Sequence, residues 1–257
     1  MNLSFFTLNF LSSLNYDRLP FIFEGRIISG VSAIVSSRAA GNMLYSGGKD
    51  GPARLALFRF LGLEPSLVYA CTQVHSREAL EVSRQSPNTG PRVDGLISRD
   101  KALTLSVTAA DCLPVFLYDT EKEGLALVHS GWKGTSIVLS ALEMMEKRWR
   151  TRPEDVAAVF GPCIRRCCYN VDQGRAGAFA AEFGGPGGTF PLGPVVSESG
   201  GEFFLDLQAA NARLLAGAGV RNISVCENCT FTDERLGSFR REGPLAYTKM
   251  AALTGFF

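Results

Sequence analysis

Two apolar runs in the middle of the chain, Leu113–Tyr118 and Leu125–Val128, limit the folds open to it more than any other segment. A polar segment ending in glycine separates them. Apolar runs of this length, bounded by turn residues, indicate buried strands, and a short polar connection between them indicates a β-hairpin. The connection is centred between Glu121 and Lys122, so residues whose numbers sum to about 243 should face each other across the hairpin.

The open end of this hairpin carries two residues with reactive side chains, Cys112 and His129. They lie near the expected register, and opposed residues of an antiparallel pair have Cα atoms roughly 4.5–5.5 Å apart. A thiol and an imidazole placed together suit a metal site or a Cys–His nucleophile. A buried cysteine beside a hydrogen-bonded histidine explains the same pattern, so the hairpin alone leaves both interpretations open.

The chain has two histidines, His75 and His129, and each lies where a predicted strand passes into a loop. Functional side chains are commonly presented at such transitions. Together with Cys112 they make a His–Cys–His set, and three N/S ligands with an open fourth position are typical of a catalytic zinc site. Zinc lowers the pKa of its water toward about 7 and acts as a Lewis acid. The three residues are too far apart in the sequence to match any short zinc motif. Separate packing roles for the two histidines and the cysteine therefore remain the alternative.

Asp111 precedes Cys112 and is a candidate partner for a histidine or a candidate base, with a turn role as the alternative. The segment Gly131–Gly134 precedes an expected helix at Thr135, and a helix N-terminus presents free N–H groups to anions. Lys133 adds a positive charge there. Trp132 could stack on a planar ligand or pack in the hydrophobic core. Further candidate substrate contacts are Arg38, Gln73 and Arg241.

The remaining cysteines fall into a CxxxCC segment, a CxxC segment and one isolated position: Cys163, Cys167, Cys168, Cys226, Cys229 and Cys71. These segments are compatible with a structural zinc site, but a CxxC without a matching second pair is a weak signal. Cysteine is among the most buried residue types, so we expect packing roles for all six.

The composition, with 46% hydrophobic and 20% charged residues over 257 positions, is typical of a soluble globular protein. The formal net charge of +1 predicts neither nucleic-acid nor membrane partners. An odd cysteine count of seven indicates reduced thiols and a cytoplasmic protein. The apolar N-terminus has no basic residue before Arg18 and predicts a first strand rather than a signal peptide.

Strand patterns dominate the first half and do not alternate regularly with helices. This favours an α+β fold, with a mixed β-sheet flanked by helices, in a single domain over residues 1–257. The expected strands are Phe5–Phe10, Phe21–Ile28, Gly30–Val35, Pro65–Val74, Gly95–Ser98, Ala102–Thr108, Asp155–Phe160, Val220–Cys226 and the two hairpin runs. The expected helices are Ala53–Leu61, Thr135–Arg150, Gln173–Phe183 after Asp172, a segment from Asp206 to Ala216, and Ala246–Leu253. The expected loops are Ala39–Pro52, Ser83–Arg92, Gly184–Gly188 and Cys229–Pro244.

Eight segments, taken in order, resemble one family from about residue 30 to the C-terminus. They are TQVHS, VDGLIS, TAADCLPVFLYD, HSGWKGT, GPCIRRCCYNV, FLDLQAANARLL, CENCTF and GSFRRE. The family was long labelled multicopper polyphenol oxidase or laccase-like and is now regarded as zinc-dependent purine nucleoside phosphorylases. Some members are called peptidoglycan editing factors.

The resemblance implies a complex α+β domain whose metal ligands fall on His75, Cys112 and His129. It implies phosphorolysis of adenosine, inosine, guanosine or methylthioadenosine to base and ribose 1-phosphate, with adenosine deamination as a second activity. Zinc would be the metal, with copper as an alternative, and nucleoside and phosphate would be the partners of a monomer or small homo-oligomer. Arg38, Lys133 and Arg241 are the candidate phosphate contacts.

The chain departs from the family pattern where phosphate and sugar would bind. The family usually reads HAGWRG, and here Ser130 and Lys133 replace Ala and Arg; lysine keeps the charge but loses the bidentate fork. The Gly-Arg after the SYRRD-like segment is missing, with Lys249 nearby, and the glycine-rich N-terminal loop is reduced to SSRAAGN. We expect these changes to spare the metal ligands and to narrow or weaken activity.

Three rival functions remain at this stage. A copper-dependent phenol oxidase conflicts with the two histidines of the chain, since a multicopper cluster needs many more, although a site of this kind can take up copper. A cysteine hydrolase, for example in peptidoglycan editing, would use Cys112, His129 and a carboxylate such as Asp111. A degenerate, non-enzymatic interaction protein is the third.

Overall fold

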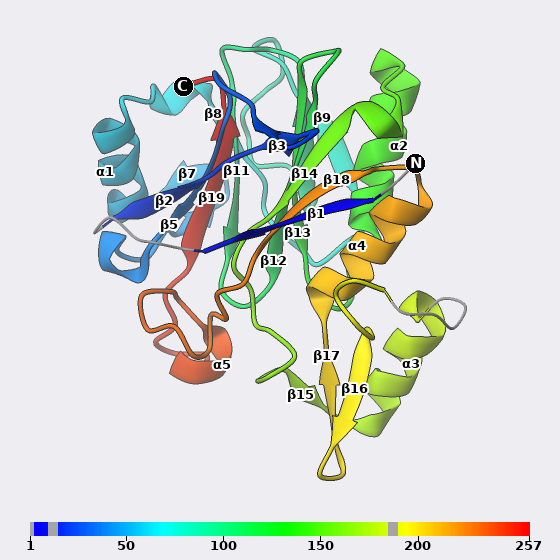
Figure 1. The fold of residues 1–257 in the computed structure, drawn as a ribbon. Coiled ribbons are helices and arrows are strands. Elements are labelled where there is room, and N and C mark those ends of the chain that lie inside the picture. The colour runs from blue at the N-terminus through cyan, green and yellow to red at the C-terminus, as the bar shows by residue number, and fades with distance from the viewer. Residues whose placement is uncertain (1–2, 10–14, 185–189) are drawn as a thin grey trace.

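The fold places two β-sheets face to face and covers each outer face with helices (Figure 1). The computed structural model describes residues 3–9, 15–184 and 190–257. The seven-stranded sheet has the order β1-β18-β14-β12-β13-β10-β9. Its strands are β1 (Ser4–Leu8), β9 (Ala79–Glu81), β10 (Gly95–Ser98), β12 (Leu113–Asp119), β13 (Gly124–Ser130), β14 (Val156–Phe160) and β18 (Asn222–Cys226). Parallel and antiparallel pairs both occur, so the sheet is mixed.

The second large sheet has five strands in the order β2-β5-β19-β11-β8. Its strands are β2 (Tyr16–Leu19), β5 (Ser32–Ser36), β8 (Val68–Ala70), β11 (Thr104–Ala109) and β19 (Met250–Gly255). Three small sheets are formed by β3 (Ile22–Phe23) with β4 (Arg26–Ile27), β6 (Tyr45–Ser46) with β7 (Lys49–Asp50), and β15 (Asn170–Val171) with β16 (Val196–Ser199) and β17 (Glu202–Leu205).

The helices are α1 (Pro52–Leu61), α2 (Ile137–Trp149), α3 (Gln173–Phe183), α4 (Leu207–Gly217) and α5 (Phe239–Glu242). Short 3₁₀ helices lie at Arg38–Ala40, Pro65–Leu67 and Pro153–Asp155. The α+β class with a mixed sheet is therefore as the sequence predicts. The caps are also confirmed: the side chains of Asp172 and Asp206 accept backbone N–H groups in the first turns of α3 and α4, and Gly62 ends α1 in the left-handed region.

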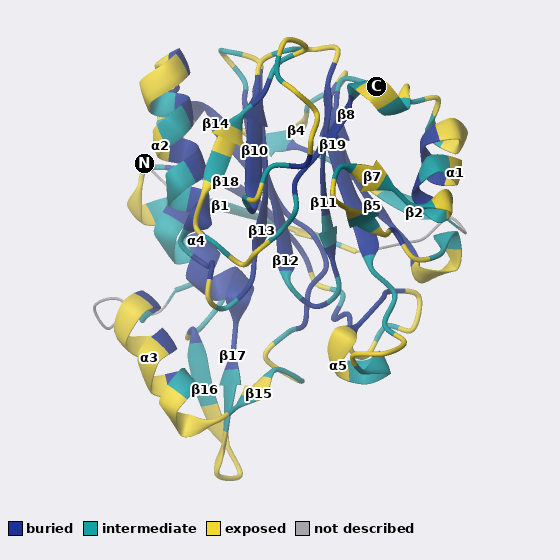
Figure 2. Ribbon diagram, turned by 180° about the vertical axis from the view of Figure 1, so that it is seen from behind, coloured by how far each residue is buried: buried dark blue, intermediate teal, exposed yellow. Residues whose placement is uncertain are grey.

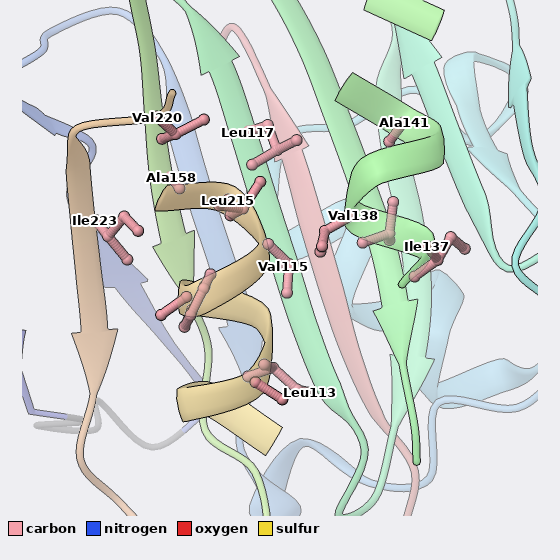
Figure 3. Packing of buried hydrophobic residues seen from close by; sticks show 14 of the residues in the cluster. Leu113, Val115, Leu117, Ile137, Val138, Ala141, Ala158, Leu215, Val220 and Ile223 are labelled. Carbon is pink, nitrogen blue, oxygen red and sulfur yellow. The ribbon is translucent and has the colours of Figure 1, made fainter. Parts of the chain in front are cut away.

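Three hydrophobic layers follow from the two-residue periodicity of the strands. In β12, Leu113, Val115 and Leu117 face α2 and α4, while Phe116 and Tyr118 face the second sheet. Figure 3 shows the first of these layers, where β12 side chains meet Ile137, Val138 and Ala141 of α2. A smaller layer lies between the five-stranded sheet and α1. Buried residues accordingly fill the centre of the molecule in Figure 2, with exposed residues on the outer helices and loops.

The hairpin has the predicted register. Leu113 faces Ser130 and Asp119 faces Gly124, so the residue numbers of opposed pairs sum as expected. The turn is stabilised by the Asp119 carboxylate, which accepts the backbone N–H groups of Glu121 and Lys122, each at 2.9 Å. The hairpin therefore fixes the position of the residues at its open end.

The prediction of a helix at Ala246–Leu253 is wrong. Residues 250–255 form β19, which pairs with β5 on one side and β11 on the other at the centre of the second sheet. Met250 and Ala252 face the layer between the sheets, while Ala251 and Leu253 face α1. A strand buried on both faces has no polar alternation, so its sequence cannot be distinguished from a short buried helix.

Other boundaries differ more modestly. Phe21–Ile28 is a small hairpin, not one strand, because Glu24 and Gly25 both have positive φ and turn the chain. Pro65–Val74 is a strand only at β8, after a 3₁₀ turn that begins at the proline. The expected loop at 39–52 contains the β6–β7 pair, and the expected loop at 229–244 contains α5. Helix α2 begins two residues after Thr135. The small sheet of β15, β16 and β17 was not predicted. Phe10 and residues 185–188 of the expected glycine-rich loop lie outside the described residues.

We predict that Leu253→Ala lowers the free energy of unfolding by about 2–5 kcal/mol, because the side chain is fully buried between β19 and α1. Leu245→Ala, at a side chain that is 99% exposed in the same C-terminal segment, is the matched control and should change stability by less than about 0.5 kcal/mol. Urea unfolding measures both. Equal effects at the two positions would contradict the placement of β19 in the core.

Candidate metal centre

The side chains of His75, Cys112 and His129 meet at the open end of the hairpin. Each offers one donor atom, and these three atoms lie within 4.8 Å of one another. The two imidazole rings lie 5.1 Å apart between centroids and are nearly perpendicular, at 74°. His129 lies in β13, Cys112 precedes β12, and His75 lies in the loop between β8 and β9. The structure thus brings together the three residues that the sequence singled out.

Asp94, just before β10, holds the two histidine segments together. Its buried carboxylate accepts the backbone N–H groups of Val74 and His75 at 3.1 Å and that of Ser76 at 2.6 Å. One oxygen also lies 3.0 Å from Nδ1 of His129. The backbone carbonyl of Asp94 in turn accepts the N–H of His129 at 2.8 Å. A carboxylate that binds Nδ1 sets the ring orientation and leaves Nε2 as the donor atom.

The charge on Asp94 is strongly favoured despite its burial. Burial alone raises the pKa of a carboxyl group, but hydrogen bonds from His129 and Ser76 outweigh it and lower the pKa of Asp94 to about 2. The sequence analysis missed this residue. Its signal was an acidic side chain placed directly before the buried strand Gly95–Ser98, within the segment VDGLIS.

The thiol and the imidazole at this site stabilise each other's charged forms. Burial opposes charge on Cys112, but the nearby His129 and hydrogen bonds from both histidines lower its pKa to about 6. Burial likewise opposes charge on His129, but Cys112 and Asp94 raise its pKa to about 9. The metal-free site therefore favours a thiolate beside an imidazolium, and a thiolate is the form of cysteine that binds metals or acts as a nucleophile.

Glycine is required in the turn that follows His129. A Cβ atom at Gly131 would lie 2.9 Å from the sulfur of Cys112 and 3.5 Å from the His75 ring. A Cβ atom at Gly134 would lie 2.7 Å from the carbonyl oxygen of Ser76. Real Cβ atoms essentially never approach other atoms closer than 3.0 Å, so a side chain at Gly131 would displace the Cys112 sulfur, and one at Gly134 would displace the backbone of Ser76, next to His75.

Asp111 lies beside Cys112 but is held by other partners. Its carboxylate accepts the hydroxyl of Thr230 at 2.6 Å and the backbone N–H of Arg240 at 2.7 Å. Its backbone has φ of +88°, a strained conformation for a residue with a side chain. The histidine contact considered for Asp111 is made by Asp94 instead, whereas a role of Asp111 as a base remains a prediction.

Two of the expected substrate contacts are fully engaged within the protein. The amide group of Gln73 clamps Thr108, donating to its carbonyl at 2.7 Å and accepting its N–H and hydroxyl at 2.8 Å. The guanidinium of Arg241 donates to backbone carbonyls of residues 230–236, including Phe231 at 3.0 Å, and to Glu242 at 2.8 Å. Both side chains hold loops around the site, and direct contact of either with substrate remains a prediction.

The other two expected substrate contacts, Arg38 and Lys133, have fewer partners within the protein. Arg38 is half-exposed and lies 3.5 Å from Glu242 in an ion pair. Lys133 stands 5.5 Å from the Trp132 ring centroid and has no ion-pair partner within the part of the chain that the structure describes. Lys133 is therefore the better placed of the predicted cations to bind an added anion.

A cluster of aromatic and cationic side chains adjoins the site; the sequence suggested Trp132 as a stacking residue but did not group it with the others. Arg175 lies over the Trp132 ring at 4.6 Å, and Arg240 lies over the Tyr169 ring at 5.6 Å. Burial and the charge of Cys112 raise the pKa of Tyr169, while Arg175 and Arg240 oppose that shift. These residues come from α3, α5 and the segments after β13 and β14, so no sequence spacing could have grouped them.

Comparison with known proteins identifies a family for this chain. The family described as "Multi-copper polyphenol oxidoreductase laccase" matches residues 52–256. The purine nucleoside phosphorylase YlmD of Geobacillus stearothermophilus is 31% identical over 199 residues, which cover 72% of this chain and 70% of that protein. A purine nucleoside phosphorylase of Mycobacterium tuberculosis is 33% identical over 204 residues, covering 76% and 77%. The crystal structure of YlmD from Geobacillus stearothermophilus matches with a TM-score of 0.80 at 26% identity, over 96% of this chain and 98% of that chain.

The chain belongs to this laccase-like family, as the sequence motifs indicated. Its similarity to relatives named purine nucleoside phosphorylases defines the class of enzyme at the level of the family. Within the described residues, none of the helices has the length and apolar character needed to cross a membrane.

We predict that Asp94→Asn weakens metal binding by roughly 10–100-fold, because loss of the carboxylate frees the His129 ring and the His75 loop. Asp111→Asn, which alters a carboxylate one residue from Cys112, should leave metal affinity nearly unchanged. Competition with a chromophoric chelator measures both affinities. A larger loss in the Asp111 variant would reverse the roles assigned to the two carboxylates.

Proposed function

We propose that this protein is a zinc-dependent purine nucleoside phosphorylase that converts a nucleoside and phosphate into a free base and ribose 1-phosphate. The observation that carries the proposal is the convergence of the His75, Cys112 and His129 donor atoms within 4.8 Å, in a chain whose relatives are named purine nucleoside phosphorylases. The substrates fit the residues around the site, which combine aromatic rings with cations.

The donor set fits zinc. One thiolate and two imidazoles match the N/S ligands of zinc sites, and three protein ligands leave a fourth position for substrate. Bound there, zinc would supply Lewis-acid polarisation of a reacting oxygen. Copper also binds such ligands, but the two histidines of the chain are too few for a multicopper cluster, so we favour zinc.

The protein's own residues would position the two substrates. Lys133 would hold phosphate as a point charge, with Arg38 as a second candidate. Trp132 and Tyr169 offer ring faces for the planar purine, flanked by Arg175 and Arg240. Gln73 and Arg241 would support the site indirectly through the loops that they hold.

Asp111 is the proposed proton acceptor or donor at this site. Thr230 and the backbone of Arg240 each occupy one hydrogen-bonding position of its oxygens, which fixes the carboxylate beside Cys112. A carboxylate oxygen has a second lone-pair position free for substrate. Holding a base in one orientation is the usual preparation for proton transfer.

A metal-free cysteine hydrolase is the second candidate, and one observation favours it. Cys112, His129 and Asp94 form a chain of hydrogen-bonding groups in the order of a Cys–His–Asp nucleophilic triad. Such an enzyme would act without bound metal, for example on cell-wall amides. We further propose a cytoplasmic protein that acts on small molecules as a monomer or small homo-oligomer.

The central experiment measures base release from adenosine and inosine, with and without phosphate, on protein of known zinc content. Phosphate-dependent release with about one active-site zinc per chain supports the phosphorylase. Ammonia release without phosphate identifies adenosine deamination instead. Full base release after removal of metal overturns the zinc mechanism, and zinc-free protein without turnover of either nucleoside directs the search to the cysteine hydrolase.

We expect Cys112→Ala to lose the metal at this centre and nucleoside turnover together, because two imidazoles alone bind zinc weakly. Cys71→Ala, which removes another buried thiol at the end of β8, is the control and should retain both metal and turnover. Metal analysis and a base-release assay provide the two readouts. Retention of full turnover by the Cys112 variant would refute the site assignment.

Lys133→Ala should raise the KM for phosphate by about tenfold or more and alter the KM for nucleoside much less, since a contact between opposite charges worth roughly 1.4 kcal/mol is lost. Lys147→Ala on the exposed face of α2 removes the same charge far from the substrates and serves as the control. Initial rates measured at varied phosphate concentration give the phosphate KM of both variants. An unchanged phosphate KM in the Lys133 variant would exclude this role.

A further inference from the structure

A second group of sulfur atoms lies outside the His75–Cys112–His129 centre. The sulfur atoms of Cys167, Cys168 and Cys229 lie within 4.8 Å of one another, and those of Cys167 and Cys168 are 3.3 Å apart. Cys229 is buried, Cys168 is half-buried and Cys167 is exposed. Two come from the loop after β14 and the third from the loop after β18, so the group links two separate segments.

Backbone hydrogen bonds hold these two loops together. Cys163 and Cys229 form an isolated parallel bridge, and the N–H of Thr230 donates to the carbonyl of Cys163 at 3.0 Å. The N–H groups of Cys168 and Tyr169 both donate to the carbonyl of Arg165 at 2.9 Å, which forms a tight turn. The sulfur atoms therefore occupy positions set by the main chain.

The environment of the buried sulfur suits a thiolate. The N–H of Arg165 donates to the sulfur of Cys229 at 3.4 Å, and such a donor stabilises negative charge on sulfur. An adjoining open pocket of about 680 Å³ reaches Cys167 and Cys229, and its lining combines three arginines with three acidic residues, so its formal charges balance. The pocket also gives an ion from solvent a path to the sulfur atoms.

The separations match those of sulfur atoms that share one ion. With metal–sulfur bonds of about 2.3 Å, the sulfur atoms around one ion lie roughly 3.8–4.0 Å apart. The 3.3 Å between the sulfur atoms of Cys167 and Cys168 is somewhat shorter than this value, and no pair in the group is more than 4.8 Å apart. Small side-chain rotations, without movement of the loops, would bring the three sulfur atoms to one ion.

We propose that Cys167, Cys168 and Cys229 form a second metal site, which takes a thiophilic d¹⁰ cation, Zn²⁺ or Cu⁺. Three sulfur donors without imidazole make a softer set than the His75–Cys112–His129 centre, and soft ligands select these ions. Binding would release the thiol protons and link the two loops.

Such a link would hold in place the residues that contact Asp111, next to Cys112. Thr230, next to Cys229, donates its hydroxyl to Asp111, and the N–H of Ile164 donates to the carbonyl of Asp111 at 2.9 Å. The two loops that the ion would join thus both hold Asp111 beside Cys112, together with the backbone of Arg240. The role is structural, because none of the three cysteines belongs to the group of donors at the first centre.

The test titrates the reduced, metal-free full chain with Zn²⁺ and, under anaerobic conditions, with Cu⁺. Wild type should bind about two ions of at least one metal, and Cys112→Ala about one. Cys167→Ser, at an exposed position that tolerates substitution, and Cys229→Ser should each also bind about one. Cys226→Ser is the matched control, since Cys226 shares the CxxC segment with Cys229 but lies outside the group, and it should bind as many ions as wild type.

X-ray absorption of the Cys112→Ala protein identifies the ligands independently of enzyme activity. A shell of three sulfur atoms at about 2.3 Å supports the site for whichever metal is bound. If neither metal binds the Cys112→Ala protein, or if Cys167→Ser and Cys229→Ser bind as many ions as wild type, the three thiols only pack together and the proposal is wrong. Neither readout depends on nucleoside turnover, so failure of the proposed function would leave this test intact.

Discussion

The buried carboxylate of Asp94 is the interaction on which the centre of this molecule depends. It binds the loop that follows β8 of one sheet and the ring of His129 in β13 of the other. An unpaired charge in such a position would be strongly destabilising, and here N–H donors from three consecutive residues and an imidazole offset the cost of burial. The two histidines are therefore held by the same carboxylate that joins the two sheets.

Around the Asp94 carboxylate the backbone departs from relaxed geometry at several positions. His75, one of the three donors, and Asp111, the neighbour of Cys112, both have positive φ, which is uncommon for residues with side chains. Gly131 and Gly134 allow the turn after His129 to approach Cys112 and Ser76 closely. Strain of this kind persists only where the surrounding structure over-determines it, and the hairpin and the Asp94 contacts do so here.

The two cysteine-containing centres differ in chemistry and in position. The first combines one thiolate with two imidazoles at the junction of the two sheets, an arrangement suited to polarising a substrate. The second has sulfur alone and lies between two surface loops. They are connected through Thr230 and Asp111, so order in the outer loops bears directly on the carboxylate beside the first centre.

Local patterns in the sequence determined the hairpin, its register, the helix caps and the meeting of Cys112 with His129, because strand pairing and capping depend on residues close in the chain. The presence of two histidines in the chain made His75 the third candidate, and the family motifs supported that choice. Only the tertiary structure decided that Asp94 orients His129, that Gln73 and Arg241 bind loops, and that residues 250–255 form a central strand. These outcomes rest on partners distant in sequence, such as the pairing of β19 with both β5 and β11, and a buried strand or a buried carboxylate carries no local sign of its partner.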